Sequence, residues 1–119
     1  LMRALCVVVS HVLADEFSQV RLAKREVPSS TVVEVECDTL DQVREAAGAG
    51  ADMILLDNMD PAEMEQAVKI VAGRAKLEAS GGITFETIRD KAATGVDFVS
   101  VGRMTQSAPA VDIGLDYDA

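Results

Sequence analysis

The sequence has 119 residues, of which 49% are hydrophobic and 26% are charged, and its formal net charge is -9. This length fits one domain with a hydrophobic core of moderate size. The acidic balance argues against a nucleic-acid partner, because binding a phosphate backbone needs a basic surface. It does not exclude a small phosphorylated ligand, since backbone amides and a divalent cation can supply the positive charge.

Cysteine use and hydropathy favour a cytoplasmic location. Cys6 and Cys37 are the two cysteines, and they indicate neither a disulfide framework nor a zinc site. The apolar run at residues 4–9 is too short to span a bilayer and lacks a signal-peptide cleavage pattern. We therefore expect no membrane association. The first residue is Leu1 rather than methionine, which hints at a segment upstream.

Five short apolar runs predict β-strands, with four segments of helical periodicity between them. The runs are residues 4–9, 32–37, 53–56, 75–79 and 98–101. Capping boxes at residues 39–42 and 60–63 predict two helix starts, and Thr84 is the expected N-cap of a helix over residues 85–92. Gly50, Gly73 and Gly95 are stop signals. Strands that alternate with helices in this way predict a parallel sheet with crossover helices.

The spacing of the units predicts part of a (β/α) barrel. Glu36, Asp57, Glu78 and Val101 follow one another at intervals of 21, 21 and 23 residues, and residues 50–57 resemble residues 95–102. We expect an α/β fold with about five parallel βα units in residues 1–110, although a doubly wound sheet is an alternative. Residues 111–119 alternate apolar and polar side chains and predict a separate terminal strand.

Residues 33–37 read VEVEC and place two carboxylates on one face of a strand. On a face open to water, Glu34 and Glu36 would simply be solvated. Inside a barrel they need partners or a chemical role. Glu36 lies nearer the carboxyl end and is the candidate for chemistry, whereas Glu34 is expected to pair with a buried cation, for which Lys76 is the candidate.

Polar residues follow several of the predicted strands, at the edge where ligands bind to parallel sheets. Asp57 and Asn58 fit an Asx turn before the next helix. Alternatively, Asp57 beside Glu36 holds sugar hydroxyls or a Mg²⁺-bound phosphate and stabilises an oxocarbenium ion. Glu78 lies at the same rim. So does His11, although a single histidine without a triad spacing is more often structural.

Two glycine-containing turns are candidates for phosphate binding. Ser80, Gly81 and Gly82 follow one strand and precede a helix, so their amides can bind an anion, although glycine is also common in plain βα turns. Residues 101–103, Val-Gly-Arg, end the next strand and offer a second amide cluster with an arginine. Such turns on adjacent strands resemble the phosphate site at the late strands of many barrels.

Four stretches carry a resemblance to a known family: VEVECDTLDQVREA, AGADMILLDNM, LEASGGIT and TGVDFVSVGRMTQSAPAVDIGLD. Across residues 32–117 the sequence resembles quinolinate phosphoribosyltransferase, the carboxylating nicotinate-nucleotide pyrophosphorylase. The resemblance implies a type II phosphoribosyltransferase, with an N-terminal α/β domain joined to an open α/β barrel in a homo-oligomer. The implied reaction converts quinolinate and phosphoribosyl pyrophosphate, with Mg²⁺, to nicotinate mononucleotide, pyrophosphate and carbon dioxide in NAD biosynthesis.

The resemblance also implies roles for individual residues. Glu36 and Asp57 match acidic residues at the ribose and pyrophosphate, where they also become candidates for Mg²⁺ contact. The residues that match loops binding the 5-phosphate are Ser80, Gly81, Gly82, Val101, Gly102 and Arg103. Arg103 departs from the small or apolar residue usual there. The family's Lys-Asp-Asn-His run corresponds to residues 8–11, which keep His11 but have Val8 in place of the lysine.

The basic residues that grip quinolinate in this family belong to an N-terminal domain that has no counterpart here. We therefore expect the isolated chain to keep the phosphoribosyl half of the site and to be catalytically inactive, with residues 111–119 suited to pair with that missing domain. A related phosphoribosyltransferase for another ring acid is an alternative. A non-catalytic phosphate-binding or oligomerisation module is another, and Val8 in the lysine position favours it.

Overall fold

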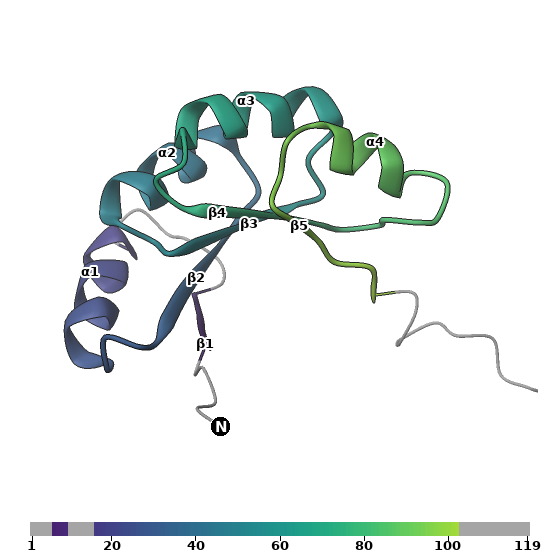
Figure 1. Ribbon diagram of the computed structural model, residues 1–119. Helices are drawn as coiled ribbons and strands as arrows, with labels where there is room; N and C mark the ends of the chain where they lie inside the picture. Colours follow the sequence, from purple (N-terminus) through teal and green to yellow (C-terminus); the bar gives the residue numbers. More distant parts are fainter. Residues whose placement is uncertain (1–5, 10–15, 103–119) are drawn as a thin grey trace, which may run out of the picture.

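The structure, a computed structural model, describes residues 6–9 and 16–102, and it contains one parallel sheet with four helices (Figure 1). The elements are β1 (Cys6–Val9), α1 (Glu16–Glu26), β2 (Val32–Cys37), α2 (Leu40–Ala49), β3 (Met53–Asp57), α3 (Pro61–Val71), β4 (Lys76–Ser80), α4 (Ile88–Ala93) and β5 (Phe98–Val99). The strand order in space is β1-β2-β3-β4-β5, the same as in the chain. A doubly wound sheet reverses its order at a switch point, so this order confirms the partial barrel. The predicted strand at 111–119 lies outside the described residues.

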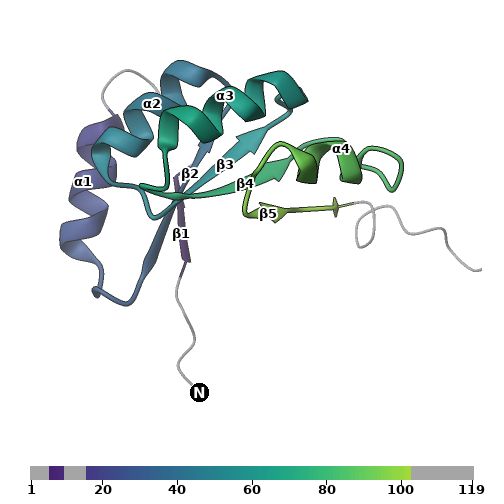
Figure 2. The ribbon, with the colours of Figure 1, turned by 45° about the horizontal axis from the view of Figure 1, so that its top comes forward.

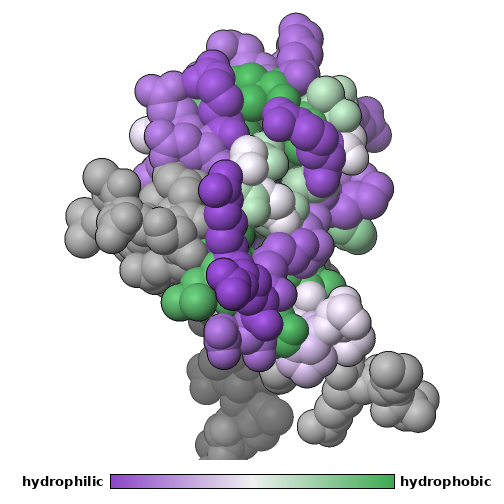
Figure 3. All heavy atoms as spheres, turned by 90° about the vertical axis from the view of Figure 1, so that its left-hand side faces the viewer, coloured by the Kyte–Doolittle hydropathy of each residue, from purple (hydrophilic) through white to green (hydrophobic). Residues whose placement is uncertain are grey.

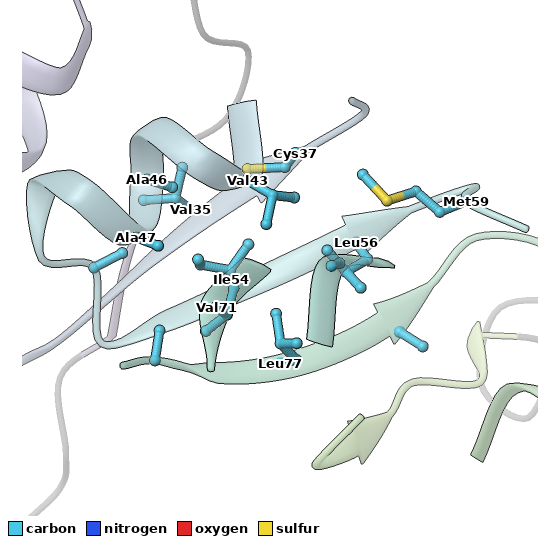
Figure 4. Close-up of a cluster of buried hydrophobic side chains, with 14 of the residues drawn as sticks. Val35, Cys37, Val43, Ala46, Ala47, Ile54, Leu56, Met59, Val71 and Leu77 are labelled. Atoms are coloured by element: carbon cyan, nitrogen blue, oxygen red, sulfur yellow. The ribbon is translucent and has the colours of Figure 1, made fainter. Parts of the chain in front are cut away.

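All four helices lie on one side of the curved sheet (Figures 1 and 2). The side chains between the two layers are apolar and buried, and Figure 4 shows Val35, Ile54 and Leu56 from the strands gathered with Val43 and Val71 from the helices. Removal of these side chains from water drives the association of the layers. The core of the described residues therefore lies between the sheet and the helices.

The opposite face of the sheet, which we call the inner face, carries a different set of side chains. Parallel partners share a face, so three rows cross it from strand to strand. The rows are Glu34–Met53–Lys76, Glu36–Leu55–Glu78–Phe98 and Asp57–Ser80. No helix among the described residues covers this face, and Phe98 is 51% exposed. The predicted division of VEVEC is confirmed, because Val33, Val35 and Cys37 are fully buried on the helix side.

The side of the molecule that carries α1 is mostly hydrophilic, with apolar residues in smaller patches (Figure 3). Among the α1 side chains that the structure describes, Leu22 is a large apolar one that is exposed. Within residues 6–9 and 16–102, no helix has the length and apolar character needed to cross a bilayer.

Two of the three predicted helix starts are confirmed. Thr39 and Asp60 each form a reciprocal capping box, with Gln42 and Glu63 respectively. The third is wrong, because α4 begins at Ile88 and residues 85–87 form a turn. The amide of Thr84 donates a 3.0 Å hydrogen bond to the hydroxyl of Thr87. The amide of Ile88 donates to the Thr84 carbonyl at 2.9 Å, so a single turn closes at Thr84 before the regular helix begins at Ile88.

The similarity between residues 50–57 and 95–102 has a structural counterpart. The carboxylate of Asp52 accepts a 2.9 Å hydrogen bond from the amide of Val33, and its own amide donates to the Val33 carbonyl at 3.0 Å. Asp97 makes the same pair of bonds with Leu77, at 2.9 Å each. Each aspartate therefore ties the start of its strand to the start of the preceding strand.

A lysine accompanies each of these aspartates. Lys24 Nζ lies 2.5 Å from Asp52, and Lys76 Nζ lies 2.6 Å from Asp97. Burial alone raises the pKa of Asp52, but the bonds from Lys24 and the Val33 amide outweigh it and hold the pKa below its ordinary value. The sequence analysis named Lys76 as a candidate partner for Glu34. The Lys76 side chain is 65% exposed and forms an ion pair with Asp97.

Replacing Asp97 with asparagine should reduce the loss of stability on acidification. The hydrogen bonds from Lys76 and the Leu77 amide hold the pKa of Asp97 below its ordinary value. The carboxylate therefore stabilises the fold above its unfolded pKa of about 3.9, and this contribution is lost as the pH falls through the lower folded value. Urea unfolding of the wild type and of Asp97→Asn should differ most at about pH 6 and converge at about pH 2. An equal difference at both pH values, or the same behaviour in the surface control Asp90→Asn, would contradict this.

Candidate functional site

The structure brings the predicted carboxylates to one face and one end of the sheet. Glu36 on β2 is in register with Leu55, which is in register with Glu78 on β4. Asp57 is the last residue of β3 and is in register with Ser80 at the end of β4. From the strand spacing and the rise per residue, the Cα atoms of Glu36 and Asp57 are roughly 8 Å apart. A sugar ring between them can therefore contact both.

Ser100 is a site residue that the sequence analysis missed. Its hydroxyl donates a hydrogen bond to Oε1 of Glu78, and its amide donates to the Ala79 carbonyl at 2.9 Å. The second bond continues the pairing of β4 beyond the last residue of β5. Ser100 lies two residues after Phe98, so the period-two alternation of this run was the signal that places it on the inner face.

The turn after β3 is fixed by Asn58. This residue has a φ of 54°, in the left-handed region. Its amide donates to the Ser80 carbonyl at 3.2 Å, and its side-chain Nδ2 donates to Oδ2 of Asp57 at 2.6 Å. The sequence analysis placed Asn58 at the rim of the site, and the structure connects it directly to the candidate carboxylate.

The two glycines after β4 have different surroundings. Both have a positive φ, 84° at Gly81 and 59° at Gly82, which favours glycine at each position. A Cβ at Gly81 would lie 2.3 Å from Oδ1 of Asn58, whereas a Cβ at Gly82 would meet nothing within 4 Å. Gly82 is exposed, so its backbone is the part of this turn that a ligand can approach.

The second glycine turn is described only in part. β5 ends at Val99, and Val101 is half-buried against the core while Gly102 is exposed. Arg103 and His11 lie outside the described residues. Phosphate binding by residues 101–103 therefore stays a prediction.

Cys37 lies beside Glu36 in the chain but does not belong to the site. Its side chain points to the helix side and is fully buried. Burial, together with the negative charges of Asp38 and Glu36, raises the pKa of the thiol to about 12. A protonated core thiol is a poor nucleophile, so the chemistry of this face belongs to its carboxylates and hydroxyls.

The carboxylates on the inner face can bind a hard divalent cation only together with oxygen atoms of a bound substrate. The described residues contain no group of three or more His, Cys, Asp or Glu side chains that could hold a metal ion. Magnesium is often bound by one or two carboxylates together with substrate phosphates and water. Glu36 and Asp57, at the strand ends, fit the carboxylate part of such a set.

Comparison with known proteins identifies the family. The family description "Quinolinate phosphoribosyl transferase, C-terminal domain" matches residues 5–116. The human nicotinate-nucleotide pyrophosphorylase (carboxylating) is 38% identical over 99 residues, covering 81% of this chain and 33% of the human protein. The rat enzyme of the same name is 40% identical over 86 residues, covering 70% of this chain and 29% of the rat protein.

A solved structure of a relative indicates the same family. The nicotinate-nucleotide pyrophosphorylase from Francisella tularensis superimposes with a TM-score of 0.80 at 37% identity, covering 91% of this chain and 39% of that chain. The chain thus spans about a third of the length of the curated relatives it matches. The sequence match and the arrangement of βα units agree, and the chain belongs to the quinolinate phosphoribosyl transferase family, as part of its C-terminal domain.

Proposed function

We propose that this chain forms the phosphoribosyl-binding part of an enzyme that makes nicotinate mononucleotide, pyrophosphate and carbon dioxide from quinolinate and phosphoribosyl pyrophosphate, in NAD biosynthesis. The observation that carries the proposal is the position of Asp57. It ends β3 on the inner face, in register with Ser80 and beside the positive-φ glycine turn, within the segment that the family description matches.

In this proposal Glu36 and Asp57 act on the ribose. Their carboxylates accept hydrogen bonds from its hydroxyls and stabilise the positive charge that develops at the anomeric carbon as pyrophosphate leaves. The hydroxyl of Ser80 and the amide of Gly82 hold the 5-phosphate, which places the sugar between the glycine turn and the two acids. The residues at 101–103 complete the phosphate site from the next strand.

Magnesium ion is the proposed cofactor, held by substrate oxygens with help from Asp57 and Glu36. When bound, it neutralises charge on the departing pyrophosphate. Phosphoribosyl pyrophosphate carries several negative charges, and the inner face adds those of Glu34, Glu36, Asp57 and Glu78. A divalent cation offsets this repulsion, because opposite charges attract strongly where water is scarce.

Quinolinate needs contacts beyond the described residues. It is a dianion, and the only basic side chain in the three rows of the inner face is Lys76, at the end of β4 away from Asp57. We propose that its carboxylates are bound by basic residues elsewhere in the complete enzyme, which acts as a homo-oligomer in the cytoplasm.

The proposal is tested by titration calorimetry of phosphoribosyl pyrophosphate with Mg²⁺ into the 119-residue chain. We expect saturable binding that Asp57→Ala weakens at least about tenfold, equivalent to about 1.4 kcal/mol. The control is Asp90→Ala, which removes one exposed carboxylate from α4 and should bind as the wild type does. No binding by a chain that circular dichroism shows to be folded would contradict the proposal, as would equal losses in the two variants.

A further inference from the structure

The turn after β3 and the turn after β4 meet at Asn58, whose side chain lies against Gly81 and whose backbone amide donates to the Ser80 carbonyl. We propose that Asn58 is a positioning residue, which fixes the carboxylate of Asp57 for the ligand and locks the two turns together. Its effect on ligand binding rests on the function proposed above. Gly81, in this view, is glycine in order to accommodate Asn58 rather than to approach a phosphate.

The hydrogen bonds of Asn58 support the first part. Nδ2 donates to Oδ2 of Asp57 at 2.6 Å, and the backbone amide donates to the carbonyl of Ser80 at 3.2 Å. Within the described residues, the other Asp57 oxygen, Oδ1, has no hydrogen-bond partner. The side chain thus selects which carboxylate oxygen is occupied and leaves the second for the ligand, while the backbone holds the turn against the end of β4.

The space around Gly81 supports the second part. A Cβ there would lie 2.3 Å from Oδ1, 2.6 Å from Cγ and 2.6 Å from the backbone nitrogen of Asn58. The Asn58 carboxamide therefore lies against the α-carbon of Gly81 through its oxygen while it donates to Asp57 through its nitrogen. Asparagine supplies the donor for Asp57 and is also among the few residues that tolerate this left-handed backbone conformation.

A second contact holds the same turn from behind. Nζ of Lys91, on α4, donates a hydrogen bond to the carbonyl of Met59, the residue after Asn58. Met59 is itself buried in the core. The Asp57–Asn58 turn is thus anchored on both sides, so the Asn58 side chain has a fixed place from which to orient Asp57. Preorganisation of this kind lowers the cost of binding a ligand.

The two glycines therefore have different roles. Gly81 is occupied by a protein contact, whereas Gly82 is exposed and open to a ligand. The 5-phosphate is then bound from the Gly82 side of the turn, and the Asn58 side governs the carboxylate. Loss of Asn58 should therefore weaken ligands that need Asp57 and should spare a ligand that needs only the phosphate turn.

The test compares Asn58→Gly and Asn58→Asp with the wild type in the 119-residue chain. Glycine keeps the left-handed conformation without a side chain, and aspartate keeps the shape but cannot donate when ionised. Binding of phosphoribosyl pyrophosphate with Mg²⁺ and of inorganic phosphate is measured for each by calorimetry. We expect Asn58→Gly to weaken the first ligand about tenfold, the loss typical of one hydrogen bond to a charged group, and to bind phosphate as the wild type does. Asn58→Asp should weaken the first ligand at least as much, because it also adds a negative charge beside Asp57.

A ligand-free measurement separates this proposal from the proposed function. In a ¹⁵N-labelled chain, the side-chain amide signals of Asn58 should shift in Asp57→Ala and stay in place in Asp90→Ala. Unchanged Asn58 signals in Asp57→Ala would overturn the proposal, and so would equal weakening of both ligands, which indicates a merely structural role. If the wild type binds neither ligand, the proposed function fails, and the Asn58 signals alone decide whether this residue positions Asp57.

Discussion

Gly81→Ala is expected to lower the free energy of unfolding by about 2–5 kcal/mol, far more than the same change at Gly82. A left-handed backbone costs alanine about 1–2 kcal/mol at either position. At Gly81 the added carbon would also lie 2.6 Å from the backbone nitrogen of Asn58, so rotation of the Asn58 side chain cannot remove the clash. Forcing an extra methyl into a packed site typically costs a further 1–3 kcal/mol or so.

Gly82→Ala is the matched control for this prediction. Its φ of 59° carries the same kind of backbone cost, but its Cβ would meet nothing within 4 Å, so we expect a loss of about 1–2 kcal/mol. Urea unfolding followed by circular dichroism measures both variants, since the chain has no tryptophan. Equal losses in the two variants would show that the Asn58 contact is absent in solution.

The contact between Asn58 and Gly81 illustrates what the sequence could not predict. The glycine turn was recognised as a turn, and its position after a strand was right. The reason for glycine at the first position depends on a side chain 23 residues earlier in the chain, which packs there only because β3 and β4 are neighbours. A local pattern carries no information about such a partner, and phosphate binding by the two glycines stays a prediction.

Local signals predicted the local structure well. The capping boxes at Thr39 and Asp60 depend on residues three positions apart, and both form as predicted. The predicted start of α4 was wrong, because residues 85–87 form a single turn after Thr84 and the regular helix begins only at Ile88. The period-two pattern of residues 33–37 gave the correct faces of β2, since strand geometry alone decides them.

The repeated Gly-x-Asp sequence, at residues 50–52 and 95–97, was predicted only in part. The similarity of residues 50–57 and 95–102 was visible and indicated repeated βα units. The role of Asp52 and Asp97 could not be predicted from the sequence, because each binds a backbone amide about twenty residues earlier in the chain. A backbone donor has no residue identity, so no sequence motif records it. The family resemblance makes Glu36 and Asp57 candidate site residues, and the structure adds how Asp57 is held.

Leu56→Ala should lower the free energy of unfolding by about 2–5 kcal/mol, whereas Leu55→Ala should lower it by about 1 kcal/mol. The two residues are neighbours on β3 and lose the same atoms. Leu56 points to the helix layer and has no solvent-accessible surface (Figure 4). Leu55 lies on the inner face between Glu36 and Glu78 and is only half-buried.

Urea unfolding of the two variants therefore measures which face of the sheet is the core in solution. Removing a side chain from a dry, packed layer costs transfer energy and leaves a cavity, whereas water can fill the space left on an open face. Equal losses would mean that the inner face of the 119-residue chain is covered in solution, by association or by residues outside the described ranges. In that case the carboxylates of Glu36 and Asp57 would also be shielded, and binding of phosphoribosyl pyrophosphate would have to displace whatever covers them.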